Sequence, residues 1–430
     1  MITSRAWSGK RYAVLGLARS GAATVDALLA SGADVVAWDS DSSRRRDDVV
    51  WQDPLTLDLT GFAAVVVSPG VPLNRHPIAA HAAKYGVPII GDIELFAQAR
   101  AGLPPHKVVG ITGTNGKSTT TALVHHILKT AGVPTTMGGN IGLPILAQDP
   151  LPTGGVYVLE LSSYQIDLTF TLDCDVAVLL NITPDHLDRY DGFSNYVASK
   201  ERLFTMQSWQ RTGIFGTDDP VAAMLGGKEK GAFIERAAIS FTEWAEVSSV
   251  VGQPAWPSLQ GSHNAQNAAV AIASCTALSV AIDAIDQGLR TYPGLPHRME
   301  RICERGGVLY VNDSKATNPD SAAPALAAYP AVRWILGGQA KSPELDACVP
   351  HFGHVRSAYT IGEAGPLFAD ILRPHMKVDE SGTLDVAVAH AARDAVAGDT
   401  VLLSPACASF DQFSDFEHRG ETFRQLVEAL

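Results

Sequence analysis

Apolar residues in the first hundred positions gather in short runs, and glycines and polar residues separate these runs. Residues 20–29 repeat their apolar positions with the spacing of a helix. The order strand, helix, strand at the start of the chain predicts a small doubly wound α/β domain. The runs with the length of buried strands are residues 11–17, 33–38, 62–67 and 87–90.

The same alternation of apolar runs and helical segments recurs twice more. A second α/β unit begins near Pro104, with strands expected at residues 156–160 and 176–180 and helices that continue to about residue 289. Residues 292–298 are rich in proline and glycine, which is typical of a linker. The strands expected beyond this linker are residues 308–311, 332–336, 357–361 and 400–403.

The fold class that this pattern predicts is α/β, with three domains that are each built on a mostly parallel, doubly wound sheet. A chain of 430 residues is longer than one hydrophobic core normally supports, which agrees with several domains. We expect the domains at residues 1–97, 98–297 and 298–430. The first and third are expected to be Rossmann-like, and the second to have a P-loop-type fold.

Composition and charge exclude several functions. With 46% hydrophobic and 18% charged residues the chain is typical of globular proteins, and no apolar run approaches the ~20 residues that span a bilayer. The net charge of −12 argues against a nucleic-acid partner, because phosphate backbones are held by clustered lysines and arginines. The five cysteines show no C-x-x-C spacing, so neither a zinc site nor a disulfide framework is expected, and a reducing cytoplasm fits.

The strongest chemical signal lies at residues 108–118, where an apolar strand leads into a glycine turn and then a helix. Glycines let successive backbone N–H groups converge on phosphate oxygens, while Lys117 supplies a positive charge and the Ser118 hydroxyl can ligate Mg²⁺. The segment therefore predicts a bound nucleoside triphosphate. Ile111 stands where the usual motif has its first glycine, so a generic motor or GTPase is not expected.

Ionisable residues follow the next strands of the same unit. Glu160 closes one strand, where a carboxylate can hold Mg²⁺ beside the phosphate turn. Residues 185–188 contain Asp-His-Leu-Asp, which is also explained as an acidic turn before a helix. Lys200, by itself, is explained as an exposed helix lysine. Asn264 and Asn267 lie three residues apart on one helix face, where they can bind an adenine or ribose or simply cap the helix.

The first and last domains carry weaker signals. The turn at residues 16–21 has the outer glycines of a dinucleotide fingerprint but lacks the middle one, and Asp39 ends the next strand, where a ribose-binding carboxylate would lie. An NAD-dependent dehydrogenase is therefore an alternative. In the last domain, Lys315 follows a strand and precedes a helix with Pro319 near its start, which makes Lys315 a candidate phosphate ligand.

Taken together, the segments at residues 16–21, 113–118, 313–318 and 404–413 closely resemble the Mur ligases of peptidoglycan synthesis. The resemblance covers essentially the whole chain, and the first and the last two of these segments are most similar to the D-glutamate-adding members. It implies that ATP phosphorylates the carboxylate of UDP-N-acetylmuramoyl-L-alanine. The amine of D-glutamate then attacks the acyl phosphate, which gives an amide, ADP and phosphate.

The resemblance also implies roles for individual residues. Those implied to bind ATP are Gly113, Thr114, Asn115, Gly116, Lys117, Ser118, Thr119, Asn264, Asn267, Arg298, Asp313 and Lys315. Those implied to hold two Mg²⁺ ions are Ser118, Glu160, His186 and Lys200, the lysine as a carbamate formed with CO₂. Those implied in catalysis are Lys117, His186, Lys200, Arg298 and Lys315.

Substrate contacts follow from the same resemblance. Those implied for the UDP substrate are Leu17, Ala18, Arg19, Asp39, Ser40, Ser68, Gly70 and Asn140. Those implied for D-glutamate are Thr317, Lys341, Ser409 and Phe416. Asp41 stands where the family often has a basic residue, and Arg44 is the candidate to replace it at the edge of the uracil pocket.

Three alternatives remain beside a D-glutamate ligase. They are another Mur or folylpolyglutamate-type ligase, the NAD-dependent dehydrogenase, and a non-catalytic nucleotide-sensing protein. The last would leave Glu160, His186 and Lys200 without a shared purpose. We expect a cytoplasmic monomer whose partners are its two substrates, with neither nucleic acid nor membrane among them.

Overall fold

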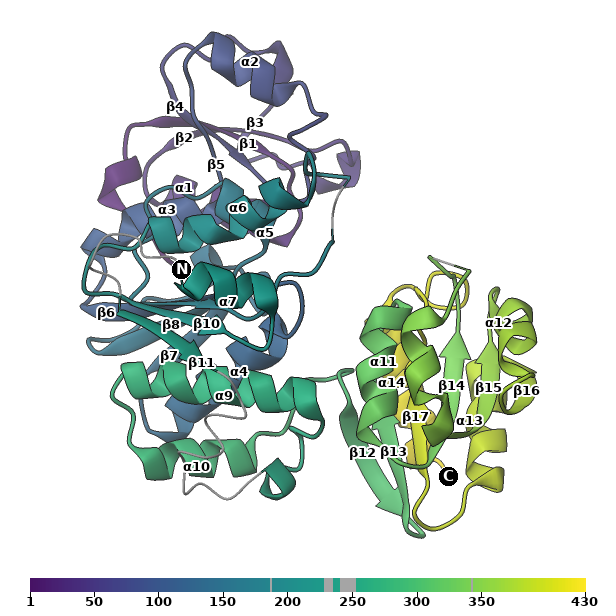
Figure 1. Cartoon of the computed structure of the whole chain (residues 1–430). Coiled ribbons are helices and arrows are strands. Elements are labelled where there is room, and N and C mark those ends of the chain that lie inside the picture. The colour runs from purple at the N-terminus through teal and green to yellow at the C-terminus, as the bar shows by residue number, and fades with distance from the viewer. Residues whose placement is uncertain (186–187, 228–234, 240–252, 342) are drawn as a thin grey trace. The chain divides into compact units, whose positions relative to one another are not determined.

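The computed structural model describes residues 1–185, 188–227, 235–239, 253–341 and 343–430. The chain divides into two compact units, each of which is described by itself. The first comprises residues 1–250 with 266–290, and the second comprises residues 251–265 with 291–430. Three sheets with helices packed on them confirm the predicted α/β class (Figure 1). No helix among the described residues has the length and apolar character to cross a bilayer.

The first sheet is parallel and has the strand order β3-β2-β1-β4-β5. Its strands are β1 (Arg11–Leu15), β2 (Asp34–Trp38), β3 (Val50–Trp51), β4 (Phe62–Val67) and β5 (Ile89–Ile90). Its helices are α1 (Arg19–Ala30), α2 (Ile78–Lys84) and α3 (Asp92–Ala99). The strand predicted at residues 11–17 ends at Leu15, because Gly16 has a φ of 87° and begins the turn that leads into α1.

The second sheet has the order β11-β10-β9-β6-β8-β7, and its strands are also parallel. Its strands are β6 (His106–Thr112), β7 (Thr135–Gly139), β8 (Gly155–Glu160), β9 (Val176–Leu179), β10 (Thr212–Gly216) and β11 (Glu235–Ile239). The helices of this part of the chain are α4 (Lys117–Thr130), α5 (Ser163–Asp167), α6 (Phe193–Thr205), α7 (Pro220–Gly227), α9 (Ser262–Ala277) and α10 (Ile282–Thr291). β8 and β9 are buried along their whole length, as central strands of a sheet covered on both faces are.

The third sheet forms the core of the second unit, with the order β12-β13-β17-β14-β15-β16. Its strands are β12 (Glu300–Arg305), β13 (Val308–Asn312), β14 (Val332–Gly337), β15 (Val355–Ile361), β16 (Lys377–Gly382) and β17 (Thr400–Leu403). Its helices are α11 (Pro319–Ala328), α12 (Gly365–Leu372), α13 (Leu384–Asp394) and α14 (Phe416–Glu428). Only β12 runs antiparallel to its neighbour in this sheet, so the sheet is mostly parallel, as predicted.

Helix α3 joins the first two sheets within the first unit. Glu94 of α3 is 2% exposed, and its Oε2 accepts hydrogen bonds from the amides of Phe170 (2.7 Å) and Thr171 (2.9 Å). Gly91, just before the helix, donates its amide to the carbonyl of Leu168 at 2.9 Å. One hydrophobic cluster runs through this junction and includes Phe96. The two sheets therefore share a core as well as buried polar contacts.

Replacing Glu94 by alanine is expected to destabilise the first unit by about 1–3 kcal/mol, because it removes the buried carboxylate that accepts two partly buried amides. Chemical unfolding followed by tryptophan fluorescence measures this loss. Glu304→Ala is the control, since that side chain is 61% exposed. Equal midpoints for the two variants would contradict the role of Glu94.

Candidate active site

The phosphate turn lies between β6 and α4, at the carboxyl edge of the second sheet. Gly116 caps α4 with a φ of 83°, and a Cβ there would come within 2.3 Å of Asn267 Oδ1. Both the backbone conformation and the contact therefore require glycine. Thr120, one turn into α4, donates its hydroxyl to the same Asn267 oxygen at 3.2 Å. The asparagine predicted to bind nucleotide thus packs directly against the turn.

The segment after β9, residues 181–183, holds the phosphate turn by hydrogen bonds. The amide of Thr114 donates to the carbonyl of Asn181 (2.9 Å), and the amide of Asn115 donates to Asn181 Oδ1 (2.8 Å). The Thr114 hydroxyl and the backbone of Thr183 are also hydrogen-bonded. Sequence analysis gave Asn181 no role. The signal was its position at the end of β9, since β9 pairs with β6, the strand that enters the turn.

Two lysine amines meet at one carbonyl of the turn. Lys117 Nζ donates to the carbonyls of Gly113 (3.0 Å) and Thr114 (2.8 Å). Lys200 Nζ, from α6, donates to the same Gly113 carbonyl at 2.9 Å. Lys200 is 1% exposed, so the interpretation as an exposed helix lysine is wrong. Burial, together with the nearby charge of Lys117, lowers the pKa of Lys200 to about 7.

Tyr196 lies one turn before Lys200 on α6 and completes this arrangement. The Lys200 amine lies 4.7 Å from the centroid of the Tyr196 ring, and the Tyr196 hydroxyl is 3.2 Å from the hydroxyl of Thr114. An aromatic face stabilises a cation only modestly, so it does not replace the hydration that Lys200 has lost. Sequence analysis did not select Tyr196, although its spacing of four residues from Lys200 puts both on one helix face.

Glu160 ends β8 beside the phosphate turn. It is 2% exposed, and its Oε1 accepts a hydrogen bond from Asn140 Nδ2 at 2.9 Å. Its Oε2 is buried and has no hydrogen-bond partner within the described part of the chain. A buried carboxylate oxygen without a donor fits a metal ligand. The structure therefore links Asn140 to Glu160, while the predicted contact of Asn140 with the muramoyl group stays a prediction.

The remaining predicted metal ligands are less informative. Ser118 is the second residue of α4 and is 9% exposed. His186 lies outside the described residues. No group of three or more His, Cys, Asp and Glu side chains with metal-binding geometry occurs within the described ranges. The described carboxylate that fits a metal here is therefore Glu160.

The turn predicted to hold the UDP group lies at the carboxyl edge of the first sheet. Asp39 is 7% exposed and accepts the amides of Leu17 (2.6 Å) and Asp41 (2.9 Å). Burial acts to raise the pKa of Asp39, but these amides and Arg44 outweigh it and hold the pKa below its ordinary value. Arg44 contacts Asp39 at 3.2 Å and Asp41 at 3.3 Å. Arg44 therefore lies beside Asp39, and its place at the edge of a uracil pocket stays a prediction.

The other residues predicted for the UDP group surround the same turn. Ala18 is the N-cap of α1 and Arg19 is its first residue, so the backbone N–H groups of a helix start face this edge. Ser68 follows β4 and donates its hydroxyl to the Gly16 carbonyl at 2.7 Å. Ser40 is exposed, and Gly70 has open space around its α-carbon. The structure thus groups these residues around one helix start.

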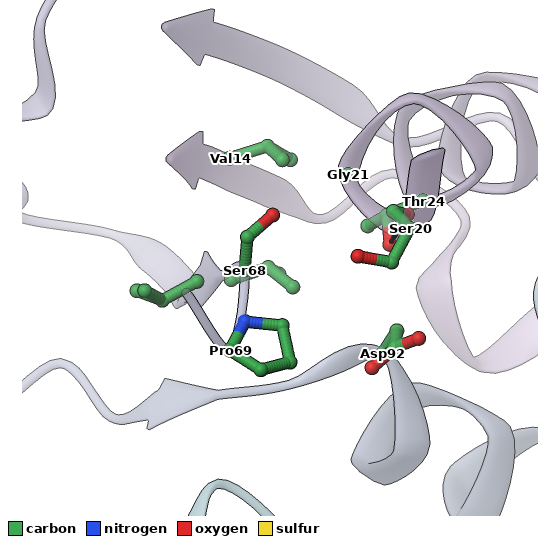
Figure 2. A pocket seen from close by; sticks show the side chains of 9 residues that line it. Val14, Ser20, Gly21, Thr24, Ser68, Pro69 and Asp92 are labelled. Atoms are coloured by element: carbon green, nitrogen blue, oxygen red, sulfur yellow. Dashed lines mark hydrogen bonds between the residues drawn. The ribbon is translucent and has the colours of Figure 1, made fainter. Parts of the chain in front are cut away.

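A buried carboxyl group lies behind this turn. Figure 2 shows Ser20, Ser68 and Asp92 around one pocket, from α1, the end of β4 and the start of α3. Asp92 is 4% exposed, and neither of its carboxyl oxygens meets hydrogen-bond geometry with a described residue. Burial raises the pKa of Asp92 to about 6, even though the amides of Ile93 and Asp92 itself oppose the rise. Sequence analysis did not select this residue.

In the second unit, loops after β13, β14 and β17 carry the residues predicted for D-glutamate and phosphate. Lys341 Nζ lies 3.5 Å from the Thr317 hydroxyl, and Lys315 Nζ lies 3.6 Å from the centroid of the Phe416 ring. Ser409 is 2% exposed. The structure therefore pairs four of these residues at the carboxyl edge of the third sheet.

Asp313 and Arg298 lie in the same unit. The Asp313 carboxylate accepts the Ser404 hydroxyl (2.8 Å) and the Met299 amide (3.1 Å), and burial raises its pKa to about 7. Arg298 lies between two non-glycine residues with positive φ, His297 (61°) and Met299 (45°). Such conformations cost of order 1–3 kcal/mol each and cluster at functional sites.

Asn264 is buried, and its side chain donates to the carbonyl of Gln260 at 3.0 Å.

Comparisons with known proteins agree with this geometry. The Mur ligase middle domain matches residues 111–275, and the Mur ligase glutamate ligase domain matches residues 297–407. The chain is 62% identical over 433 residues to the UDP-N-acetylmuramoylalanine--D-glutamate ligase of Novosphingobium aromaticivorans. The match covers 100% of this chain and 97% of that protein. It is 57% identical over 447 residues to the protein of the same name from Zymomonas mobilis, with 100% of each chain covered.

Solved structures share the fold at much lower identity. The UDP-N-acetylmuramate-alanine ligase of Thermotoga maritima has a TM-score of 0.58 at 16% identity, over 97% of this chain and 99% of that chain. A pseudomurein peptide ligase type C from Methanothermus fervidus has a TM-score of 0.55 at 19% identity, and the match covers 98% of this chain and 100% of that chain. The protein is an α/β enzyme of the nucleotide-dependent ligase class. The chain belongs to the Mur ligase family.

The raised pKa of Asp92 predicts a stability difference that depends on pH. Because the folded-state pKa lies above the unfolded value, ionisation of Asp92 destabilises the fold as pH rises from 4 through about 6. Asp92→Asn cannot ionise. Its free energy of unfolding relative to the unmodified protein should therefore rise by up to about 3 kcal/mol between pH 4 and pH 8.

Urea unfolding at a series of pH values measures this difference. The matched control is Asp218→Asn, which makes the same substitution at an exposed side chain. A flat difference for Asp92→Asn over the same range would show that the carboxyl group titrates normally.

Proposed function

We propose that this protein uses ATP to join D-glutamate to UDP-N-acetylmuramoyl-L-alanine, through an acyl-phosphate intermediate, in cytoplasmic peptidoglycan precursor synthesis. The observation that carries the proposal is the pair of lysine amines on the Gly113 carbonyl, beside the glycine turn and the buried Glu160. The substrates are those in the names of the relatives with 57–62% identity. Five unpaired cysteines agree with a reducing compartment.

The chemistry explains why a lysine lies at the phosphate turn. A carboxylate that approaches the γ-phosphate of ATP meets like charge, which costs about 4 kcal/mol per unit pair at roughly 4 Å and an effective dielectric of about 20. Unopposed, this cost slows the reaction nearly a thousandfold. Lys117, at the start of α4, offsets it through its charge and the converging amides of the turn. Arg298 and Lys315 act on the same phosphates in the proposed reaction.

Mg²⁺ supplies further positive charge to the phosphate oxygens when it is bound. The described residues that fit it are Glu160, through its unpartnered Oε2, and the hydroxyl of Ser118. Asn140 holds the other oxygen of Glu160 and so fixes the direction in which Oε2 points. The second ion, with His186 and the modified Lys200 as ligands, is carried over from the family resemblance.

We assign a carbamate to Lys200 because only the neutral amine reacts with CO₂. A pKa of about 7 leaves much of the Lys200 amine neutral near physiological pH, whereas an ordinary lysine stays almost fully charged. Carbamylation turns a buried cation into an anionic oxygen ligand. It also removes the repulsion between two amines that share one carbonyl.

The two substrates are assigned to the other two sheets. The start of α1 and the Asp39–Arg44 pair suit the diphosphate and uracil of the UDP substrate. Lys341 with Thr317 suits the carboxylates of D-glutamate. Ser409 and Phe416 are assigned to the same substrate, and Lys315, over the Phe416 ring, is assigned to the phosphates. The protein acts as a monomer in this proposal.

Phosphate release tests the activity. With UDP-N-acetylmuramoyl-L-alanine, ATP and Mg²⁺, release should depend on D-glutamate, and mass spectrometry should detect the amide product. L-glutamate, L-alanine and diamino acids serve as the competing acceptors, since they represent the other ligases of the family. Release that depends on one of those acceptors, and not on D-glutamate, would contradict the assignment.

Replacing Lys200 tests the carbamate. Lys200→Arg keeps a positive charge but cannot form the carbamate, so both Lys200→Arg and Lys200→Ala should lose at least about 1000-fold in kcat. Lys129→Ala, an exposed lysine on α4, is the control and should keep full activity. An active Lys200→Arg variant would mean that the lysine acts as a cation.

The carbamate itself can be observed without turnover. ¹³C-bicarbonate NMR of the intact protein should give a carbamate signal that grows from pH 6 to pH 8, because deprotonation of Lys200 supplies the reactive amine. The signal should be absent from Lys200→Arg. A signal of equal size in that variant would assign the carbamate to another amine.

A further inference from the structure

The guanidinium of Arg419 is one of the largest side chains that are fully buried in the second unit. It is 1% exposed and projects from the first turn of α14. Its Nη2 donates to the carbonyls of Ser314 (2.8 Å) and Cys407 (3.0 Å), and its Nη1 donates to the carbonyl of Ala408 at 3.3 Å. Its Nε donates to the Ser314 hydroxyl at 3.0 Å.

These contacts join three loops at one group. Ser314 lies in the loop after β13, which carries Lys315 and Thr317, while Cys407 and Ala408 lie in the loop after β17, which carries Ser409. The third loop follows β14 and leads to Lys341. Its Gly338 approaches so closely that a Cβ would come within 3.2 Å of Arg419 Nη1.

The charge of Arg419 is not balanced by a direct partner. No carboxylate lies within ion-pair distance of it in the described part of the second unit, and its acceptors are neutral carbonyls and one hydroxyl. Burial lowers the pKa of Arg419 to about 10, although the nearby Cys407 and Asp411 oppose this fall, and the group stays charged at neutral pH. A buried charge without a direct ion pair is costly to the fold and acts over several ångströms, because little water screens it.

We propose that Arg419 is a positioning residue for the incoming amino acid, and that its buried positive charge favours a substrate with two carboxylates. The proposal rests on the proposed function and deepens it at the acceptor site. Its hydrogen bonds fix the spacing of the loops that bear Thr317 and Ser409, and the loop that leads to Lys341 packs against it through Gly338. Its charge adds to that of Lys341. A planar guanidinium can reach all three loops at once, whereas a lysine amine cannot.

Steady-state kinetics of two variants test the proposal on the full chain. Arg419→Lys keeps the positive charge but loses the planar set of N–H donors of the guanidinium. Arg419→Gln keeps some hydrogen bonds and loses the charge. The KM for D-glutamate should rise about tenfold in the first and about 100-fold in the second, as expected for lost hydrogen bonds to a charged group. The KM values for ATP and for UDP-N-acetylmuramoyl-L-alanine should stay within about twofold of the original.

Arg333→Lys is the matched control, because Arg333 is a partly buried arginine of the same sheet that pairs with Asp399 at 2.8 Å. It should lower the thermal midpoint without a selective change in the KM for D-glutamate. If the Arg419 variants raise all three KM values together, or if both variants have the same KM values, Arg419 only maintains the fold. Failure of the proposed function is separate, since the unmodified protein would then show no release dependent on D-glutamate.

Discussion

Two lysine amines that share the carbonyl of Gly113 are the interaction on which the rest of the site depends. Two positive charges at one acceptor repel each other, and Lys200 is too deeply buried for water to screen it. The proton of Lys200 is therefore weakly held, and its pKa falls to about 7. The turn thus makes the amine of Lys200 reactive.

The three sheets share one arrangement of polar residues. In each of them the polar residues follow the carboxyl ends of parallel strands, where loops and helix starts expose backbone N–H groups. In the first unit the Gly16 turn and the Gly113 turn use this edge, and in the second unit the loops after β13, β14 and β17 do so. All three proposed substrates carry phosphates or carboxylates, and each edge provides backbone donors together with a lysine or arginine.

Much of this arrangement could be predicted from the sequence because it depends on local patterns. The apolar runs of β1, β8 and β17 are short, continuous and bounded by glycine or polar residues, and the turn before Lys117 has a characteristic spacing. The strands that were not predicted are β3, β7, β10, β11, β12 and β16, and the prediction made β5 longer than it is. β3 and β5 are only two residues long, and β12 is charged and partly exposed. Their existence depends on pairing with neighbouring strands rather than on their own composition.

The parts of the site that escaped prediction are those made by contacts between distant residues. Lys200 has the sequence context of a surface lysine, but α6 packs against α5 and β9, and the Lys200 amine lies 3.4 Å from the hydroxyl of Thr112 at the end of β6. Asp92 and Arg419 likewise carry no local signal, because their significance comes from partners, or the lack of partners, far away in the chain. Asn181 stands at the end of a predicted strand, but its partner Asn115 is also distant in the chain. Helical spacing gives the face on which such a residue lies, but not what covers that face.

The pKa of the Lys200 amine tests the account most directly. Selective ¹⁵N labelling of lysine and NMR titration of the intact protein in CO₂-free buffer would measure it, with the Lys200→Arg spectrum to assign the signal. The account predicts an apparent pKa of about 7, and a rise when Lys117 is replaced by methionine. A pKa near the ordinary lysine value of about 10.4, unchanged by that replacement, would contradict it.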